Sequence, residues 1–212
     1  MTVSVLPAGS VLFDGVCARR GGGIAFDFWH GNQHLPALRA ALPASRQARY
    51  ASAVRASMVS IFELAPDEDV NVALRVSATP SETVDWQERF VAVPFSAHRR
   101  PDAHETGQPG CAPIAYPVFF AVPPEGEHDF DNWYDDEHMN ILLGCKAWLG
   151  CRRFRLLGSH PQGWTHMALH DLADISAIAS PERDAARATA WRERLSANAW
   201  FKGDYRVLYR LA

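Results

Sequence analysis

Hydrophobic and polar positions along the chain follow the same series of patterns twice. Each half opens on an apolar run typical of a strand and continues with apolar residues at helical spacing, such as Phe26, Trp29, Leu35 and Leu38. Two more strand-like runs, a second helix and a closing strand follow. The expected strands cover residues 11–16, 48–54, 58–64 and 90–95, and then 116–122, 152–157, 164–172 and 205–211. Both halves therefore predict the element order β-α-β-β-α-β.

Two motifs recur in the same order in the two halves, which predicts an internal duplication. In the first motif a histidine follows a tryptophan by five residues, and Phe26, Trp29 and His34 match Phe130, Trp133 and His138 at a constant spacing of 104 residues. In the second motif, Trp86-Gln87-Glu88-Arg89 matches Trp191-Arg192-Glu193-Arg194 at a spacing of 105 residues. We expect the second motif on the second helix of each half.

This element order is that of the ferredoxin-like split βαβ plan, an antiparallel sheet with both helices on one face. The other face of such a sheet is apolar and has to be covered. The predicted fold class is therefore α+β, with two tandem ferredoxin-like βαββαβ units packed sheet to sheet as a pseudo-dimeric α+β barrel. The first unit is expected at 1–97, a linker rich in Pro, Gly, His and Asp at 98–113, and the second unit at 114–212.

Composition narrows the class of protein. The 212 residues are 48% hydrophobic and 21% charged, with a net charge of −3 and basic residues scattered rather than clustered, which argues against nucleic acid as a partner. Neither a membrane span nor a signal peptide is expected, so the predicted location is cytoplasmic. Four cysteines are dispersed without a C-x-x-C pair, and no structural metal is predicted.

The segment Phe130 to His138, FDNWYDDEH, followed by Arg152-Arg153-Phe154-Arg155, resembles the signature of EthD-like members of the dimeric α+β barrel superfamily. The resemblance covers the second half from about residue 116 onward. The first half is similar only at Trp29, His34 and Arg49, because His30-Gly31-Asn32-Gln33 replaces the acidic stretch. The resemblance implies two units packed sheet to sheet, each with a pocket between sheet and helices. Its members include isomerases, cofactor-free monooxygenases and haem-handling enzymes, so the fold does not fix the reaction.

His138 and His34 are the candidate acid/base residues, because an imidazole titrates near neutral pH. In the alternative interpretation each histidine only braces a neighbouring element through hydrogen bonds. Tyr134 lies one helical turn before His138 and is a candidate hydrogen-bond donor. His30 and His34 have the spacing of a helical metal pair but lack the glutamate of a zinc protease, so no metal is predicted.

Five further residues are candidates for binding substrate. Trp133 and Trp29 would supply aromatic walls, and Arg153 could clamp a carboxylate or an enolate, although a salt bridge to a helix acid is the alternative. His166 and His170 share one face of a strand about 13 Å apart, which is too far for one ion. They would line a cavity or simply be satisfied on the sheet face.

These residues predict a small cofactor-independent enzyme, a lyase or isomerase that uses His-based proton transfer on an aromatic or conjugated organic acid or ketone. The alternatives are a non-catalytic binder of small hydrophobic molecules and a cofactor-free monooxygenase or haem-handling protein. Activity is expected in the second half, because the first lacks the Asp-Asp-Glu run. The expected partner is a small-molecule substrate, and the chain is compatible with a homodimer.

Overall fold

The computed structural model describes residues 6–52, 57–76, 82–103 and 111–212, which form two compact units. The first unit comprises residues 1–93 with 211 and 212, and the second comprises residues 94–210. Strand β4 (Val84–Arg99) passes from the first unit into the second. The boundary predicted after residue 97 therefore lies inside a strand, and the predicted linker 98–113 begins within it. Part of that linker, 104–110, lies outside the described residues.

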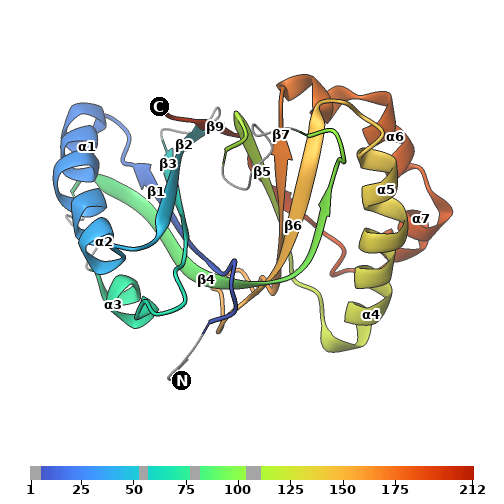
Figure 1. Cartoon of the computed structure of the whole chain (residues 1–212), viewed down its shortest axis with the longest axis horizontal. Coiled ribbons are helices and arrows are strands. Elements are labelled where there is room, and N and C mark those ends of the chain that lie inside the picture. The colour runs from blue at the N-terminus through green and yellow to red at the C-terminus, as the bar shows by residue number, and fades with distance from the viewer. Residues whose placement is uncertain (1–5, 53–56, 77–81, 104–110) are drawn as a thin grey trace. The chain divides into compact units, whose positions relative to one another are not determined.

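The first unit has the order β-α-β-β-α-β, as expected. Its elements are β1 (Val11–Ala18), α1 (Gly23–Trp29), the π-helical turn η1 (His30–His34), α2 (Leu35–Ala41), β2 (Arg46–Ser52), β3 (Ser57–Glu63), α3 (Val70–Arg75) and β4. Strand β1 lies between β3 and β4, β2 pairs with β3, and all these pairings are antiparallel. The three helices lie on one side of this sheet (Figure 1), where Leu12, Leu35 and Phe62 are in one core cluster.

The second helix of the first unit is not where the sequence predicted it. Trp86 to Arg89 lie on strand β4 and pair with β1, with Trp86 opposite Cys17 and Arg89 opposite Asp14. Gln, Glu and Arg favour helices weakly, and pairing along a whole strand overrides such propensities. The helix is instead α3, where the Asp69 carboxylate caps the first turn by accepting from the Asn71 backbone N–H at 3.0 Å. The second motif is therefore not structurally equivalent in the two halves, and the tandem duplication stays a prediction.

The second unit repeats the β-α-β-β-α-β order with a longer second helical segment. Its elements are β5 (Ile114–Phe120), α4 (Pro124–Asn132), the π-helical turn η3 (Trp133–His138), α5 (Met139–Leu142), β6 (Trp148–Leu156), β7 (His166–Leu172), the 3₁₀ turn η4 (Ile175–Ala179), α6 (Pro181–Arg187), α7 (Ala190–Ser196), β8 (Asp204–Tyr205) and β9 (Leu208–Arg210). Strand β7 lies between β6 and β5, and β8 and β9 also pair with β5. The helices lie on one side of this sheet (Figure 1).

The predicted hairpin of the second unit is present, and its turn contains the chemistry that the sequence indicated. Strands β6 and β7 flank Gly158 and Gly163, which have φ of 81° and 74°. Glycine adopts this left-handed region at little cost, which explains both residues. The corresponding turn of the first unit falls on 53–56, outside the described residues.

A π-helical turn follows the tryptophan-bearing helix in each unit. In an α-helix, two residues five apart point about 140° away from each other, whereas the wider i→i+5 turn brings them onto one face. The tryptophan and histidine rings accordingly meet, with centroids 4.6 Å apart for Trp29 and His34 and 4.4 Å apart for Trp133 and His138. The five-residue spacing found in the sequence is the spacing of this contact.

Candidate functional site

A cavity of about 230 Å³ lies in the second unit and is lined by residues of β5, β6, β7, η3, α5, α6, α7 and the segment after α7. Seven of its fifteen lining residues are Phe, Trp or Tyr: Tyr116, Phe120, Trp133, Tyr134, Trp148, Phe201 and Tyr205. Its polar groups are two histidines and three arginines: His138, His170, Arg183, Arg187 and Arg192. An apolar cavity with a few convergent polar groups is typical of a small-molecule site.

The π-helical turn η3 brings three predicted residues to this cavity, Trp133, Tyr134 and His138. The His138 ring packs against the Trp133 ring at an interplanar angle of 32° and meets the Tyr134 ring edge-on, with centroids 5.0 Å apart. Both aromatic residues are buried in the same core cluster as Phe130. The turn therefore holds a titratable ring and a phenol side by side on rigid helical backbone.

The Tyr134 hydroxyl is oriented by a chain of hydrogen bonds. The Trp148 indole N–H donates to His170 Nδ1 at 3.0 Å, and His170 Nε2 lies 2.8 Å from the Tyr134 oxygen. An indole N–H can only donate, so Nδ1 of His170 carries the lone pair and Nε2 carries the proton. Burial and the charge of Arg153 lower the pKa of His170 well below its usual value, which keeps the ring neutral. His170 therefore donates to Tyr134, whose own O–H proton is left for another acceptor.

Tyr134 itself stays protonated. Burial raises the pKa of this fully enclosed phenol well above its usual value of 10.0. A phenol of this kind donates a hydrogen bond but does not act as a base at neutral pH. The nearby Cys151 thiol is also neutral, since burial raises its pKa.

His138 is a neutral imidazole whose two nitrogens differ. Burial lowers the pKa of His138 to about 3, a hydrogen bond to the Ala186 backbone partly opposes this, and the charges of Arg192, Arg153 and Arg183 lower it further. Nδ1 is buried and has no hydrogen-bond partner in the described part of the chain. By elimination, the N–H that donates to the Ala186 carbonyl is on Nε2, and Nδ1 bears the lone pair.

Two of the three arginines are placed by helix caps that the sequence reasoning did not use. The Ser180 side chain accepts from the Arg183 backbone N–H at the start of α6, and the Thr189 side chain does the same for Arg192 at the start of α7. Each capping residue is thus followed, three residues later, by an arginine that reaches the cavity. Arg183 and Arg192 were not predicted from the sequence. The sequence pattern that could have indicated them is a Ser or Thr helix cap followed three residues later by Arg.

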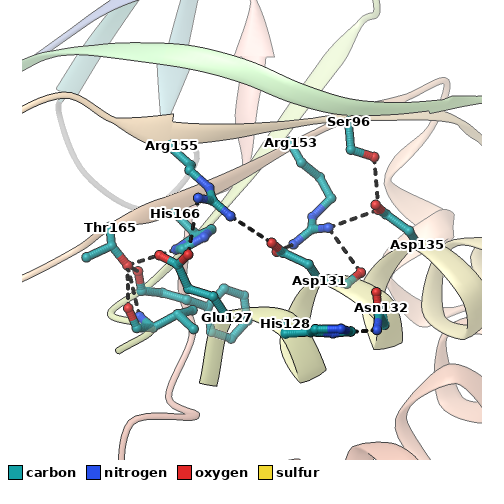
Figure 2. A network of polar contacts seen from close by, with 12 residues as sticks. Ser96, Glu127, His128, Asp131, Asn132, Asp135, Arg153, Arg155, Thr165 and His166 are labelled. Atoms are coloured by element: carbon teal, nitrogen blue, oxygen red, sulfur yellow. Dashed lines mark hydrogen bonds and ion pairs between the residues drawn. The ribbon is translucent and has the colours of Figure 1, made fainter. Parts of the chain in front are cut away.

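Arg153, predicted to bind substrate, lies outside the cavity lining and is held by carboxylates. Its side chain is 2% exposed and forms ion pairs with Asp131 and with Asp135, the latter at 2.9 Å (Figure 2). Its guanidinium carbon lies 4.5 Å from the centre of the Tyr134 ring, a cation–π contact. Arg153 therefore supports Tyr134 from outside the cavity, which matches the salt-bridge alternative of the sequence analysis.

The two strand histidines do not act together. His170 lines the cavity, whereas His166 is absent from its lining and contacts the Thr165 hydroxyl at 2.8 Å through Nδ1. Figure 2 shows His166 beside the network of Glu127, Asp131 and Arg155. Burial lowers the pKa of His166 to about 4. The charge of Asp131 raises this pKa, and the charge of Arg155 lowers it further.

His34 of the first unit, which corresponds to His138, has different hydrogen-bond partners. His34 Nε2 donates to the Asp14 carboxylate at 2.7 Å, and the other oxygen of Asp14 accepts from Arg89 at 2.7 Å and from Gln87 at 3.3 Å. Trp29 lines a separate open hollow of about 770 Å³, and His34 is not among the residues around it. The geometry of His34 is therefore that of the bracing alternative. In the described ranges, no group of three or more His, Cys, Asp or Glu could hold a metal ion.

Solved structures of other proteins share this fold, although the sequence has no match among protein families. No protein-family model and no curated protein matches the sequence. Its structural neighbours are dimeric α+β barrel proteins of ferredoxin-like type. An anthrone oxidase-like protein superposes with a TM-score of 0.68 at 9% identity, covering 97% of this chain and 92% of that one.

Two other solved structures cover the chain to a similar extent. A mutant chlorite dismutase from Candidatus Nitrospira defluvii has a TM-score of 0.61 at 8% identity, with coverage of 97% and 92%. A monooxygenase structure from Fusobacterium nucleatum has a TM-score of 0.57 at 7% identity, with coverage of 98% and 94%. At such identities the likeness shows the fold alone. The fold predicted from the sequence is thus supported, and the EthD-like resemblance stays a prediction. In the described residues, no helix has the length and hydrophobicity needed to cross a bilayer.

Proposed function

We propose that the second unit is a small cofactor-independent enzyme, a lyase or isomerase, that acts on an aromatic or conjugated organic acid or ketone. The observation that carries this proposal is the convergence of Tyr134 and His138 in the wall of one aromatic cavity. A cavity of about 230 Å³ is smaller than the roughly 300–1,000 Å³ of sites for drug-sized ligands. This size suits a substrate with a single ring.

Tyr134 is the group that stabilises developing negative charge. When a proton leaves the carbon next to a carbonyl, charge moves to the carbonyl oxygen and an enolate forms. The free O–H proton of Tyr134 can then bond to that oxygen, while the Trp148–His170 chain holds the hydroxyl in place. Donors fixed before the reaction at the position of such an oxygen account for much of many enzymes' rate enhancement.

His138 is the group that moves the proton. For this role the Nδ1 lone pair, which is buried in the structure, must become accessible to the substrate carbon. It would then accept the proton and return it to a second carbon in an isomerisation, or stay protonated while a leaving group departs in an elimination. In the empty cavity this ring is a weak base, because burial and then the charges of Arg192 and Arg183 lower its pKa. A bound anion offsets those charges, so an acidic substrate would itself raise the basicity of His138.

The decisive experiment is deuterium exchange at substrate carbon in heavy water, followed by NMR over a panel of arylpyruvates, arylacetates and unsaturated ring acids and ketones. We expect exchange by the wild type, a loss of about 10²–10³-fold in Tyr134→Phe and of about 10²–10⁴-fold in His138→Gln. His128→Gln is the matched control, because His128 is exposed on α4, does not line the cavity and has its hydrogen bond with Asn132. Wild-type rates in both cavity variants would refute the proposal.

The same samples separate the alternatives. Saturable binding with no exchange and no product would indicate a non-catalytic binder of small hydrophobic molecules. Oxygen uptake that matches the amount of product would indicate a cofactor-free monooxygenase, since an enolate can also react with dioxygen. A haem does not fit this cavity, because about 230 Å³ is less than even drug-sized ligands need, and the porphyrin is larger than a single-ring acid.

A further inference from the structure

Three arginines line the cavity. Arg183 and Arg187 come from α6 and Arg192 from α7, and they are the charged members of the lining that the structure describes. Within the described ranges, no carboxylate forms an ion pair with any of the three. By contrast, the nearby Arg194 on the same helix α7 is paired with Asp129 at 2.6 Å.

The contacts that Arg183 and Arg192 make fix their positions without neutralising them. Arg183 donates to the Ile178 carbonyl at 2.9 Å and to the Tyr116 hydroxyl, and Arg192 donates to the Arg187 carbonyl at 3.2 Å. The Arg192 guanidinium also lies 5.7 Å from the centre of the Phe201 ring. Because these partners are neutral, positive charge accumulates in the wall of an aromatic cavity.

This accumulation of positive charge is energetically unfavourable unless an anion binds beside the arginines. Burial and the charges of Arg187 and Arg183 lower the pKa of Arg192, so the three guanidinium groups repel one another across the site. Guanidinium groups remain charged at all physiological pH values, so the repulsion cannot be relieved by losing a proton. Planar guanidinium groups bind carboxylates through paired, charge-assisted hydrogen bonds, which is the ordinary reason for such a cluster.

We propose that Arg183 and Arg192 form a carboxylate-binding subsite, so that the ligand of this cavity is an aromatic or conjugated acid rather than a neutral ketone. This inference rests on the proposed function only for the location of the site. Arg187 is exposed and adds attraction at longer range, which increases the rate of association more than the affinity. The aromatic walls bind the ring, and the carboxylate lies at the arginines.

The experiment measures binding, not turnover, on the full chain. Benzoate and phthalate are the anionic probes, benzamide is the neutral probe of the same shape, and the fluorescence of Trp133 and Trp148 in the cavity wall reports occupancy. We expect benzoate to bind at least tenfold more tightly than benzamide, and phthalate at least as tightly as benzoate. A charge-assisted hydrogen bond is sufficient for a difference of this size. Raising the salt concentration should weaken the binding of both anions and leave benzamide unchanged.

Variants assign the effect to residues. Arg183→Gln and Arg192→Gln should each lose about tenfold in benzoate affinity with no change for benzamide, and Arg194→Gln, on the same helix but paired with Asp129, should change neither. Equal affinity for benzoate and benzamide, unchanged affinity in both variants, or no binding of any probe at millimolar concentration would each overturn the inference. Acid-selective binding without deuterium exchange would instead keep the subsite and remove the enzymatic proposal. Exchange of ketones that is independent of these arginines would do the reverse.

Discussion

Replacing Asp14 by Asn should destabilise the first unit strongly, because this carboxylate is the centre of a buried polar cluster. Its side chain is 1% exposed and it binds His34 and Arg89, whose side chains are 0% and 7% exposed. Asparagine keeps one acceptor oxygen but places an NH₂ group among donors and leaves the Arg89 charge without a counter-ion. Breaking a buried pair in this way costs about 3–5 kcal/mol.

That magnitude is a large part of the roughly 5–15 kcal/mol by which domains are usually stable. With a urea dependence of about 1–3 kcal/mol per molar, the midpoint should fall by at least about 1 M. Hydrogen exchange of peptides from β1, read by mass spectrometry, should locate the loss in the first unit. Asp27→Asn is the matched control, because Asp27 is exposed on α1, and it should change stability by less than about 0.5 kcal/mol.

The effect should also depend on pH with a defined sign. Burial alone would raise the pKa of Asp14, but the hydrogen bond and charge of His34 and the interactions with Arg89 outweigh it and lower that pKa. The stabilisation is therefore complete above the unfolded-state pKa of about 3.9 and is lost as the pH falls through the lower folded-state value. The wild type should lose its advantage over Asp14→Asn only below about pH 4. A difference below about 0.5 kcal/mol at pH 7, or one that is constant down to pH 2, would show that the cluster does not stabilise the unit.

Three further results are expected. His138, with a pKa of about 3, should show no change in its NMR ring signal between pH 5 and 8 in the free protein, and a midpoint near 6.5 would contradict its burial. Since its folded pKa lies below the unfolded value, its contribution to stability is complete above about pH 6.5 and declines as the pH falls towards 3. Gly150→Ala should lower the thermal midpoint, because a Cβ there would lie 2.8 Å from the His98 carbonyl oxygen, whereas Gly31→Ala meets nothing within 4 Å and should be neutral or stabilising. Arg153→Lys should destabilise the second unit in urea by about 1–3 kcal/mol, because lysine cannot bridge two carboxylates in the same plane, and a fully stable variant would contradict this.

The element order of both units could be predicted from hydrophobic periodicity, but the assignment of Trp86 could not. The segment around Trp86 contains helix-favouring residues and becomes a strand because β1 pairs with it along its length. That pairing is a contact between segments far apart in the chain, which local patterns do not encode. The error also removes one of the two motifs on which the prediction of duplication rested.

The candidate site was predictable where its residues are close in sequence. Trp133, Tyr134 and His138 lie on one turn, and their repetition in the chain drew attention to them. Arg183 and Arg192 were missed because the wall opposite that turn is built by helices some 50 residues later. The role of His170 depends on which ring nitrogen carries the proton, and only the contact with Trp148 decides that.

The π-helical turns have a consequence for how this site can be altered. A π-turn holds one residue more than an α-turn, so removing any single residue between Trp133 and His138 would restore regular winding. The histidine would then follow the tryptophan by four residues, about 40° around a regular helix, so the two rings would stay on one face. With the present spacing of five residues, by contrast, replacing the π-turn by regular α-helical winding would place the two rings about 140° apart and end their contact. The contact between the rings therefore depends on the five-residue spacing together with the wider turn. The first unit has the same combination at Trp29 and His34.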